Sequence, residues 1–359
     1  MSSGGGVGLC LSGGGYRAML FHTGALLRLN ELGWLPRLDV VSSVSGGSLA
    51  AGILARYWDT LDFGIDGVAR NFDANVLEPV RAAARLSLDV RVALRAMVKP
   101  GISAGEELAA SYRRHVLGDI GLRELPAQPR FVFTAANLQT GALWRFSRDT
   151  MGDKVVGGST SPEVSLATAV AASSAFPPLL SPVQVPMPRW DVPGNGRTER
   201  PAKVVLSDGG VYDNLGLEPT DGCELLLVSD AGLRMPRTND IARDWARHML
   251  RVVDVIDNQV RSLRKHELIE SYVDGSNAGA YWASYSRIGN FGLPDALPAP
   301  AELTHRLAQL PSRCKRTPEL TQERLLNWGY AVCDAGMRRW VAPDAARPRD
   351  YPFASAGLG

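Results

Sequence analysis

Twice within the first sixty residues, a short apolar run stops abruptly at small residues and is followed by a helical pattern. Val7 to Leu11 leads into Ser12-Gly13-Gly14-Gly15, and residues 38–44 lead into Ser45-Gly46-Gly47. Strands that alternate with helices in this way form parallel sheets whose two faces are covered by helices. The sequence therefore predicts an α/β fold with three layers, α/β/α, around a mainly parallel central sheet.

The rest of the chain adds strands and long helices, and we expect it to form a single domain over residues 1–359. Further strands are predicted at residues 131–136, 143–146, 204–206 and 225–228, with a hairpin about Thr140-Gly141 joining the first two. Residues 60–125 carry helical patterns without a clear strand, which indicates a helical insertion or lid. Residues 236–342 are predicted to form a mostly helical C-terminal extension, with long helices over 239–272 and 317–340, and 343–359 a poorly ordered tail.

The overall composition excludes several classes of protein. The 39 basic and 37 acidic side chains leave a net charge of +2, whereas a dedicated nucleic-acid binder carries a concentrated basic excess. No apolar stretch reaches the roughly 18 residues of a spanning helix, and the first residues lack the features of a signal peptide. The four cysteines have no zinc-ligand spacing, so we expect reduced, buried thiols. We expect a soluble cytoplasmic protein that binds no nucleic acid; the sequence leaves its oligomeric state open.

Ser45 lies where the second predicted strand meets its helix. A serine on such a strand–turn–helix corner is exposed above the sheet, and the glycines beside it let a substrate approach closely. The helix N-terminus behind it favours developing negative charge. A serine at this position is also typical of an ordinary helix N-cap, so the position alone leaves nucleophile and cap as alternatives.

The glycine loop Gly13-Gly14-Gly15 is the second candidate site. Its backbone N–H groups, at the start of a helix, can bind an anion, either a phosphate or the oxyanion of an acyl-transfer intermediate. Gly13, Gly15 and Ala18 also fit the G-x-G-x-x-G/A fingerprint of dinucleotide-binding proteins. That fold needs an acidic residue at the end of the second strand, where this chain has its serine turn; Asp39 lies at the beginning of the strand instead. An oxyanion-binding loop is therefore favoured over a nucleotide site.

A third motif, Asp208-Gly209-Gly210, follows another predicted strand and again places a side chain at the rim of the sheet. A turn-forming Asp-Gly is frequent by itself. The three motifs in this order, Ser12-Gly13-Gly14-Gly15-Tyr16-Arg17, Val44-Ser45-Gly46-Gly47 and Asp208-Gly209-Gly210, resemble those of the patatin-like phospholipase family. Ala172-Ser173-Ser174-Ala175-Phe176-Pro177 also resembles the family's small-residue helix that ends at proline. The resemblance covers residues 7–235.

The resemblance implies a patatin-like fold and a lipid acyl hydrolase of the phospholipase A or lysophospholipase type, working without a metal or other cofactor. It assigns Ser45 as the nucleophile and Asp208 as its general base, a dyad that includes no histidine. The backbone of Gly13, Gly14 and Gly15 would form the oxyanion hole. Arg17 would help to fix this loop, and Gly47, Gly209 and Gly210 would support the turns. The implied substrate is a phospholipid or another acyl-ester lipid.

Two residues depart from the family pattern. Ser43 replaces the first glycine of the family's G-x-S-x-G motif, and Ala18 stands where many members have glycine. Both replacements are small, so we expect the close packing of the two turns to survive.

Other residues offer alternative assignments. A Ser-Asp-His triad would need a histidine after the aspartate; His248, His266 and His305 follow it, but each lies in a helical pattern rather than on a loop after a strand. Asp213 and Asp230 are the other acids near strand ends, and Asp213 is the more plausible rival base. A non-catalytic or ligand-gated lipid- or nucleotide-binding protein on the same scaffold is the alternative from another functional class.

Basic side chains recur at helical spacing within the predicted insertion, at Arg81, Arg85, Arg91, Arg95 and Lys99. A basic amphipathic helix can rest on an anionic membrane surface, so peripheral membrane contact is one expectation. A lid helix that packs on the core with its basic side chains in water fits the same pattern and is favoured.

Overall fold

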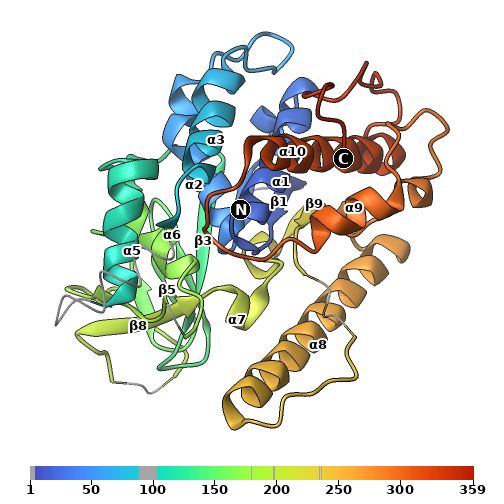
Figure 1. Cartoon of the computed structure of the whole chain (residues 1–359). Helices are drawn as coiled ribbons and strands as arrows, with labels where there is room; N and C mark the ends of the chain where they lie inside the picture. Colours follow the sequence, from blue (N-terminus) through green and yellow to red (C-terminus); the bar gives the residue numbers. More distant parts are fainter. Residues whose placement is uncertain (1–4, 89–102, 179, 197–198, 234, 236) are drawn as a thin grey trace.

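The computed structural model describes residues 5–88, 103–178, 180–196, 199–233, 235 and 237–359 (Figure 1). Its strands are β1 (Gly6–Leu11), β2 (Val40–Ser43), β3 (Arg130–Asn137), β4 (Leu143–Phe146), β5 (Met151–Asp153), β6 (Gly157–Ser159), β7 (Val183–Pro186), β8 (Lys203–Asp208), β9 (Cys223–Asp230) and β10 (Ala278–Ala283). Its α-helices are α1 (Gly15–Glu31), α2 (Gly46–Tyr57), α3 (Glu78–Ala84), α5 (Ala104–Tyr112), α6 (Leu166–Ser173), α7 (Gly210–Asp213), α8 (Trp245–Val273), α9 (Ala301–Ala308) and α10 (Glu319–Gly336). Short 3-10 or π-helical turns are η1 (Leu35–Arg37), η2 (Trp58–Thr60), η3 (Asp73–Leu77), η4 (Arg113–Leu117), η5 (Leu122–Glu124), η6 (Glu218–Thr220), η7 (Ile288–Phe291) and η8 (Met337–Val341).

The described strands form one 10-stranded sheet. β10, β9, β1, β2 and β3 lie side by side in that order, and each pair of neighbours is parallel. β4, β5 and β6 continue the sheet antiparallel beyond β3, while β8 pairs antiparallel with β3 and β7 with β8. The expected mainly parallel central sheet is confirmed, and so is the hairpin that joins β3 to β4.

Both faces of the parallel strands are buried, because alternate side chains enter two separate apolar cores. Leu9 and Phe133 belong to the larger core, which also contains residues of α1, α2 and α10. Their neighbours Cys10 and Val132 belong to the second core, where Leu268 of α8 packs. Helices therefore cover the sheet on both sides, which is the predicted three-layer arrangement.

Helices α1 and α10 pack closely because each presents a glycine to the backbone of the other. A Cβ added to Gly24 would collide with the carbonyl oxygen of Leu326, and one added to Gly329 would collide with that of Phe21. This packing joins the first helix of the chain to the C-terminal region, and the two helices lie side by side in Figure 1.

Replacing Gly329 with alanine is expected to lower the free energy of unfolding by about 2–3 kcal/mol, because the new methyl group must push two helix backbones apart. Gly289→Ala is the matched control, since a Cβ there would meet nothing within 4 Å. Urea denaturation of both variants measures the difference. Equal stability of the two variants would contradict the close backbone packing of α1 and α10.

In the C-terminal half the structure adds one strand that was not predicted and corrects the start of one predicted helix. β10 was not predicted, because Ala278-Gly279-Ala280 lacks the branched side chains typical of strands. Pairing with β9 and complete burial of the Trp282 side chain stabilise it instead. The helix expected from residue 239 begins at Trp245, after Asp244, whose carboxylate accepts a hydrogen bond from the backbone N–H of Arg247.

The prediction of a poorly ordered tail over residues 343–359 is wrong. The side-chain amide of Asn327 donates hydrogen bonds to the carbonyl groups of Phe353 and Gly357 and accepts one from the N–H of Phe353. Leu358 is buried in the larger core. A polar side chain of α10 thus holds the end of the chain, a long-range contact that local composition cannot reveal.

The predicted basic helix lies only partly within the described residues, since Arg91, Arg95 and Lys99 fall outside them. Arg81 and Arg85 are described, and they form ion pairs with Glu323 and Glu319 of α10 at 2.9 and 3.1 Å. These two arginines therefore contact the protein itself. Among the described residues, no helix has the length and apolar character needed to cross a bilayer.

Candidate active site

The carboxyl ends of β2 and β8 meet along the same side of β3. β2 pairs with the first half of β3 and places Ser43 opposite Phe133. β8 runs in the opposite direction, pairs with the second half of β3 and places Asp208 opposite Ala135. The two strand ends therefore point toward each other, and the turns that follow them bring Ser45 close to Asp208.

Ser45 has an unusual backbone conformation. Its φ of 52° makes it the one non-glycine residue with a positive φ in the described part of the chain. Such a conformation costs about 1–3 kcal/mol and persists where the surroundings enforce it. Although Ser45 occupies the N-cap position of α2, its side chain makes no capping hydrogen bond. The hydroxyl is therefore not used to cap the helix, and the side chain is partly exposed.

A cluster of serines supports this turn, and the sequence analysis assigned it no role. The N–H of Ser45 donates to Ser173 Oγ at 3.0 Å, at the end of α6. Ser173 Oγ is also hydrogen-bonded to Ser48 Oγ, which donates to Ser43 Oγ at 3.0 Å. Ser43, the departure from the family pattern, is thus tied into the turn. The adjacent serines before the proline at the end of α6 were the available signal.

Asp208 is a buried carboxyl group, and one of its two oxygens lacks a hydrogen-bond partner among the described residues. Its Oδ1 accepts a hydrogen bond from the N–H of Gly210 at 2.8 Å, whereas no described group forms a full hydrogen bond with Oδ2. Burial raises the pKa of Asp208 to about 7. The Gly210 N–H and the nearby Ser45 hydroxyl oppose this rise, and the charge of Asp257 adds to it. A buried carboxyl group with a pKa near neutrality and one unpaired oxygen thus lies beside the Ser45 hydroxyl.

The glycine loop lies against the same turn. A Cβ added to Gly13 would come within 3.2 Å of the Cβ of Ser45. The Gly13 N–H donates to the carbonyl of Asn214 at 3.2 Å, whereas those of Gly14 and Gly15 have no hydrogen-bond acceptor among the described residues. Both of these glycines have positive φ, 145° and 59°, which glycine adopts without strain. In this structure the unpaired donors of the loop are therefore Gly14 and Gly15.

Close backbone contacts hold the three motifs together. A Cβ on Gly46 would collide with Gly15, one on Gly47 with the Leu11 carbonyl oxygen, and one on Gly209 with the Thr134 carbonyl oxygen. Asn214, which the sequence analysis missed, lies with its side-chain oxygen against both Gly13 and Gly210. No local pattern marked Asn214, because its contact with the glycine loop joins distant parts of the chain.

Arg17 is buried beside the glycine loop, and its Nη2 would lie 2.8 Å from a Cβ on Gly14. Its guanidinium group donates to the Ala308 carbonyl at 2.7 Å and to Ser312 Oγ at 2.9 Å. Arg17 thus connects the start of α1 to the segment after α9.

The residues named as alternatives in the sequence analysis make other contacts. Asp213 is fully buried and accepts hydrogen bonds from the N–H groups of Leu215 and Leu217, so it stabilises a turn. Asp39 accepts from the Val7 N–H at the opposite end of the sheet, where a ribose partner would not lie. Among the described histidines, none is hydrogen-bonded to Ser45 or Asp208; His22 bridges Ser12 and Ser229.

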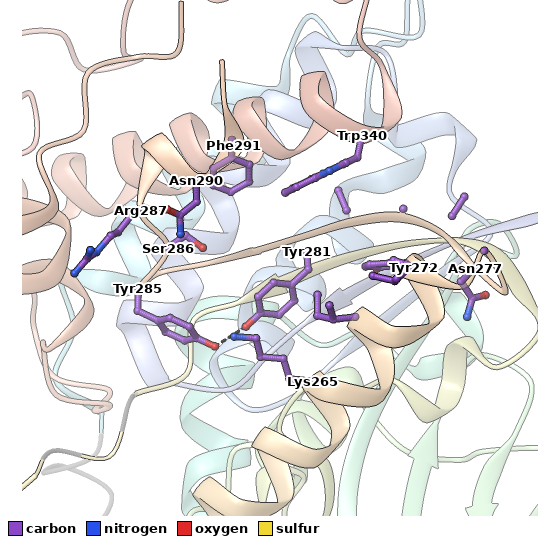
Figure 2. Close-up of a pocket in the computed structure, with 16 residues that line it drawn as sticks. Lys265, Tyr272, Asn277, Tyr281, Tyr285, Ser286, Arg287, Asn290, Phe291 and Trp340 are labelled. Atoms are coloured by element: carbon purple, nitrogen blue, oxygen red, sulfur yellow. Dashed lines mark hydrogen bonds between the residues drawn. The ribbon is translucent and has the colours of Figure 1, made fainter. Parts of the chain in front are cut away.

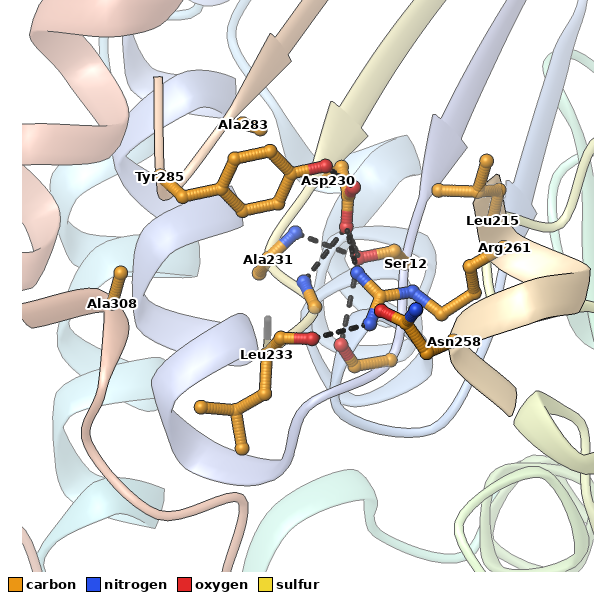
Figure 3. A network of polar contacts seen from close by, with 12 residues as sticks. Ser12, Leu215, Asp230, Ala231, Leu233, Asn258, Arg261, Ala283, Tyr285 and Ala308 are labelled. Carbon is orange, nitrogen blue, oxygen red and sulfur yellow. Dashed lines mark hydrogen bonds and ion pairs between the residues drawn. The ribbon is translucent and has the colours of Figure 1, made fainter. Parts of the chain in front are cut away.

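Asp230 forms the centre of a second polar network at the end of β9 (Figure 3). It accepts hydrogen bonds from the hydroxyls of Tyr281 and Tyr285 at 2.7 Å and lies 3.5 Å from Arg261. Burial opposes its ionisation, yet Arg261 and the two tyrosines lower the pKa of Asp230. Ser12, at the start of the glycine loop, also contacts it at 3.4 Å. Asp230 is thus an ion-paired structural carboxylate that supports the loop.

Replacing Asp230 with alanine is expected to lower the free energy of unfolding by about 3–5 kcal/mol, because it removes the partner of the nearly buried Arg261. Asp230→Asn, which keeps acceptor and donor groups in place, should lose less. Urea denaturation measures both variants. Wild-type stability of Asp230→Ala would contradict the role of Asp230 as the anchor of this network.

A groove of about 910 Å³ runs beside the edge strand β10 (Figure 2). Tyr281 and Tyr285 line it together with Lys265, whose ammonium group lies 5.1 and 5.2 Å from the centres of their rings. Neither Ser45 nor Asp208 lines this groove, so it is separate from the candidate dyad. Within the described residues, no three His, Cys, Asp or Glu side chains gather as they would around a metal ion.

The fold and the site together define a class: an α/β protein with a strained serine on a strand–helix turn, a buried carboxyl beside it and a glycine loop with free N–H groups. The family model described as patatin-like phospholipase matches residues 9–221. The match covers more than half of the chain, and the chain belongs to this family.

The two structures of human GIVD cytosolic phospholipase A2 share the fold at low sequence identity. Human GIVD cytosolic phospholipase A2 has a TM-score of 0.51 and 13% identity over 91% of this chain and 58% of that one. Its complex with methyl gamma-linolenyl fluorophosphonate has a TM-score of 0.51 and 15% identity over 92% and 57%. VipD from Legionella pneumophila has a TM-score of 0.36 and 17% identity over 92% and 66%. The chain spans less than two thirds of these proteins. No curated protein matches the sequence.

Proposed function

We propose that this protein is a lipid acyl hydrolase of the phospholipase A or lysophospholipase type, which cleaves fatty-acyl esters through Ser45 and Asp208. The observation that supports the proposal is that the ends of β2 and β8 lie close together along β3, with the strained Ser45 near the buried Asp208, whose Oδ2 is unpaired. Membership of the patatin-like phospholipase family supports the same chemistry.

In the proposed reaction Ser45 Oγ attacks the ester carbonyl and its proton passes to Asp208 Oδ2. The N–H groups of Gly14 and Gly15 stabilise the negative charge that develops on the carbonyl oxygen, and such a donor typically contributes about 3–4 kcal/mol. The ester bond then breaks, the alcohol leaves with the proton, and an acyl-enzyme remains on Ser45. Water, activated by Asp208, attacks the acyl-enzyme and releases the fatty acid.

The proposed substrate is a phospholipid or another acyl-ester lipid, met at a membrane surface from the cytoplasm. The human enzyme of the same fold is in complex with a fluorophosphonate that carries a linolenyl chain, which supports a fatty-acyl substrate here. The partly exposed Ser45 leaves the nucleophile open to such a chain.

The test is labelling with a fluorophosphonate probe together with hydrolysis of a short-chain nitrophenyl ester in the presence of a chelator. We expect one probe per chain, attached at Ser45 as located by peptide mass spectrometry, and release of nitrophenol. Labelling without turnover would indicate a ligand-gated enzyme. Absence of both would contradict the proposal and favour a non-catalytic binding protein.

The rate of ester hydrolysis should depend on the protonation of Asp208. A general base must be ionised, and burial raises the pKa of Asp208 to about 7, so kcat/KM is expected to rise with pH, reach half its maximum near 7 and level off above it. A pH–rate profile on the nitrophenyl ester measures this. A flat profile between pH 5 and 9 would contradict a role for Asp208 as the base.

A further inference from the structure

The exposed apolar side chains of this protein are concentrated on one helix. Among the described residues, sixteen large apolar side chains are exposed, and ten of them lie between Ile241 and Val273. The side chain of Trp245, at the start of α8, is 84% exposed. Large apolar patches on a soluble protein mark sites where a partner or a membrane binds.

The first half of α8 is amphipathic with an unusually wide apolar face. At 100° per residue, Trp245, Met249, Val252, Val253 and Ile256 fall on one side of the helix, and all five are exposed. Arg247, Arg251, Asp254 and Asn258 lie on the opposite side of this half, while Asp257 and Gln259 lie at the margins of the apolar side. We call the five exposed apolar residues the α8 apolar face.

The second half of α8 anchors the helix next to the candidate active site. Arg264 lies 3.6 Å from the carboxylate of Asp213, and its guanidinium group stacks over the ring of Tyr212. Both residues belong to α7, the helix that begins directly after Asp208-Gly209. The charge of Asp257 reaches Asp208. Figure 1 shows α8 beside α7, and the α8 apolar face ends at Ile256, the residue directly before Asp257.

Two further exposed apolar side chains lie at the dyad itself. Val211 follows the Asp208 turn directly and is 52% exposed. Phe176 is 62% exposed and follows Ala175, whose carbonyl accepts the N–H of Asp208. Exposed apolar side chains thus occur in the segments next to Asp208 as well as on the neighbouring helix.

We propose that the α8 apolar face is a lipid-docking surface, which inserts among the acyl chains at the surface of an anionic bilayer and holds the dyad against it. The charge pattern favours a lipid surface over a protein partner, because the segment 237–251 at the start of the helix carries Arg237, Arg243, Arg247 and Arg251 against Asp240 and Asp244, while the two aspartates that follow, Asp254 and Asp257, lie outside the apolar face. An indole such as that of Trp245 also prefers the boundary between headgroups and acyl chains. The inference deepens the proposed function and rests on it.

The test uses full-length protein with the Ser45→Ala substitution, so that no hydrolysis alters the vesicles. Vesicles of equal parts phosphatidylcholine and phosphatidylglycerol are expected to bind the protein in flotation. Met249→Asp/Ile256→Asp in the same background should weaken binding by about 10-fold or more, since two apolar side chains can no longer enter the bilayer. Leu138→Asp/Leu320→Asp is the matched control, with side chains that are 53% and 48% exposed elsewhere on the surface, and should bind as the parent does.

A second readout reports on insertion directly. Vesicles with brominated acyl chains should quench tryptophan fluorescence in the parent, and Trp245→Phe should remove most of that quenching. Equal vesicle binding by the two double variants, or quenching that survives Trp245→Phe, would overturn the proposal. So would a parent protein that fails to bind vesicles, or one that is a dimer in sedimentation and becomes a monomer with Met249→Asp/Ile256→Asp. Because binding is measured without catalysis, a failure of the proposed hydrolase activity leaves these outcomes distinguishable.

Discussion

Replacing Ser45 with alanine is expected to lower ester hydrolysis by about 10⁴–10⁶-fold. The catalytic residues act as a unit, so the loss of the nucleophile removes nearly all of their contribution to the rate. The hydroxyl makes no capping hydrogen bond, so the variant should unfold at the temperature of the wild type. Fluorophosphonate labelling should disappear with the activity. Nitrophenyl ester hydrolysis and a thermal melt measure the two effects on the same sample.

Ser174→Ala is the matched control for Ser45→Ala. The Ser174 hydroxyl lies 3.5 Å from the Ser45 carbonyl oxygen and donates to Val170 within α6, so it belongs to the support of the turn. This variant should keep fluorophosphonate labelling at Ser45. Substantial hydrolysis by Ser45→Ala, or loss of labelling only in Ser174→Ala, would place the nucleophile at another serine of the cluster.

The local turns of the site were predictable from sequence, whereas their proximity in the folded protein was not. Small residues after an apolar run mark the end of a strand, and this rule located the glycine loop, Ser45 and Asp208. Their proximity depends on β2 and β8 pairing with successive halves of β3 in opposite directions. That register joins segments far apart in the chain, and no periodicity within either segment encodes it.

The same distinction explains what the sequence analysis missed. β10 has a sequence of low strand propensity and is stabilised by its partner β9, so only tertiary pairing reveals it. Asn214 and Ser173 are ordinary residues by composition, and they matter because they contact Gly13 and the Ser45 N–H. The sequence indicated the glycine loop as a source of N–H donors. Only the structure shows that the Gly13 N–H donates to Asn214, whereas those of Gly14 and Gly15 have no acceptor among the described residues.

Replacing Asp208 with asparagine is expected to lower hydrolysis by about 10²–10⁴-fold and at the same time to stabilise the fold. Asparagine keeps the shape and cannot accept the Ser45 proton, which accounts for the lost activity. The stability gain follows from burial, which raises the pKa of Asp208 from 3.8 to about 7. A shift of this size corresponds to up to about 4 kcal/mol of destabilisation when the carboxyl is ionised.

The sign of this effect sets its pH dependence. Below about pH 4 the carboxyl is protonated in both the folded and the unfolded chain, so wild type and Asp208→Asn should differ little in stability. Between pH 4 and 7 the unfolded chain releases its proton while the folded one retains it, and the stability of the wild type falls relative to the variant. Above pH 7 the difference is complete. Urea denaturation at pH 5 and pH 8 should therefore show a larger advantage of Asp208→Asn at pH 8.

Asp213→Asn provides the contrasting control for this measurement. The Asp213 carboxylate accepts two backbone N–H groups and lies 3.6 Å from Arg264, so its neutralisation should destabilise the fold. If Asp208→Asn is more stable than the wild type and Asp213→Asn is less stable, then the Asp208 carboxyl serves catalysis at a cost in stability, and the Asp213 carboxyl stabilises the fold. If Asp208→Asn were instead destabilised at pH 8, Asp208 would be a structural carboxylate as well, and its oxygen would not be free to take the proton of Ser45.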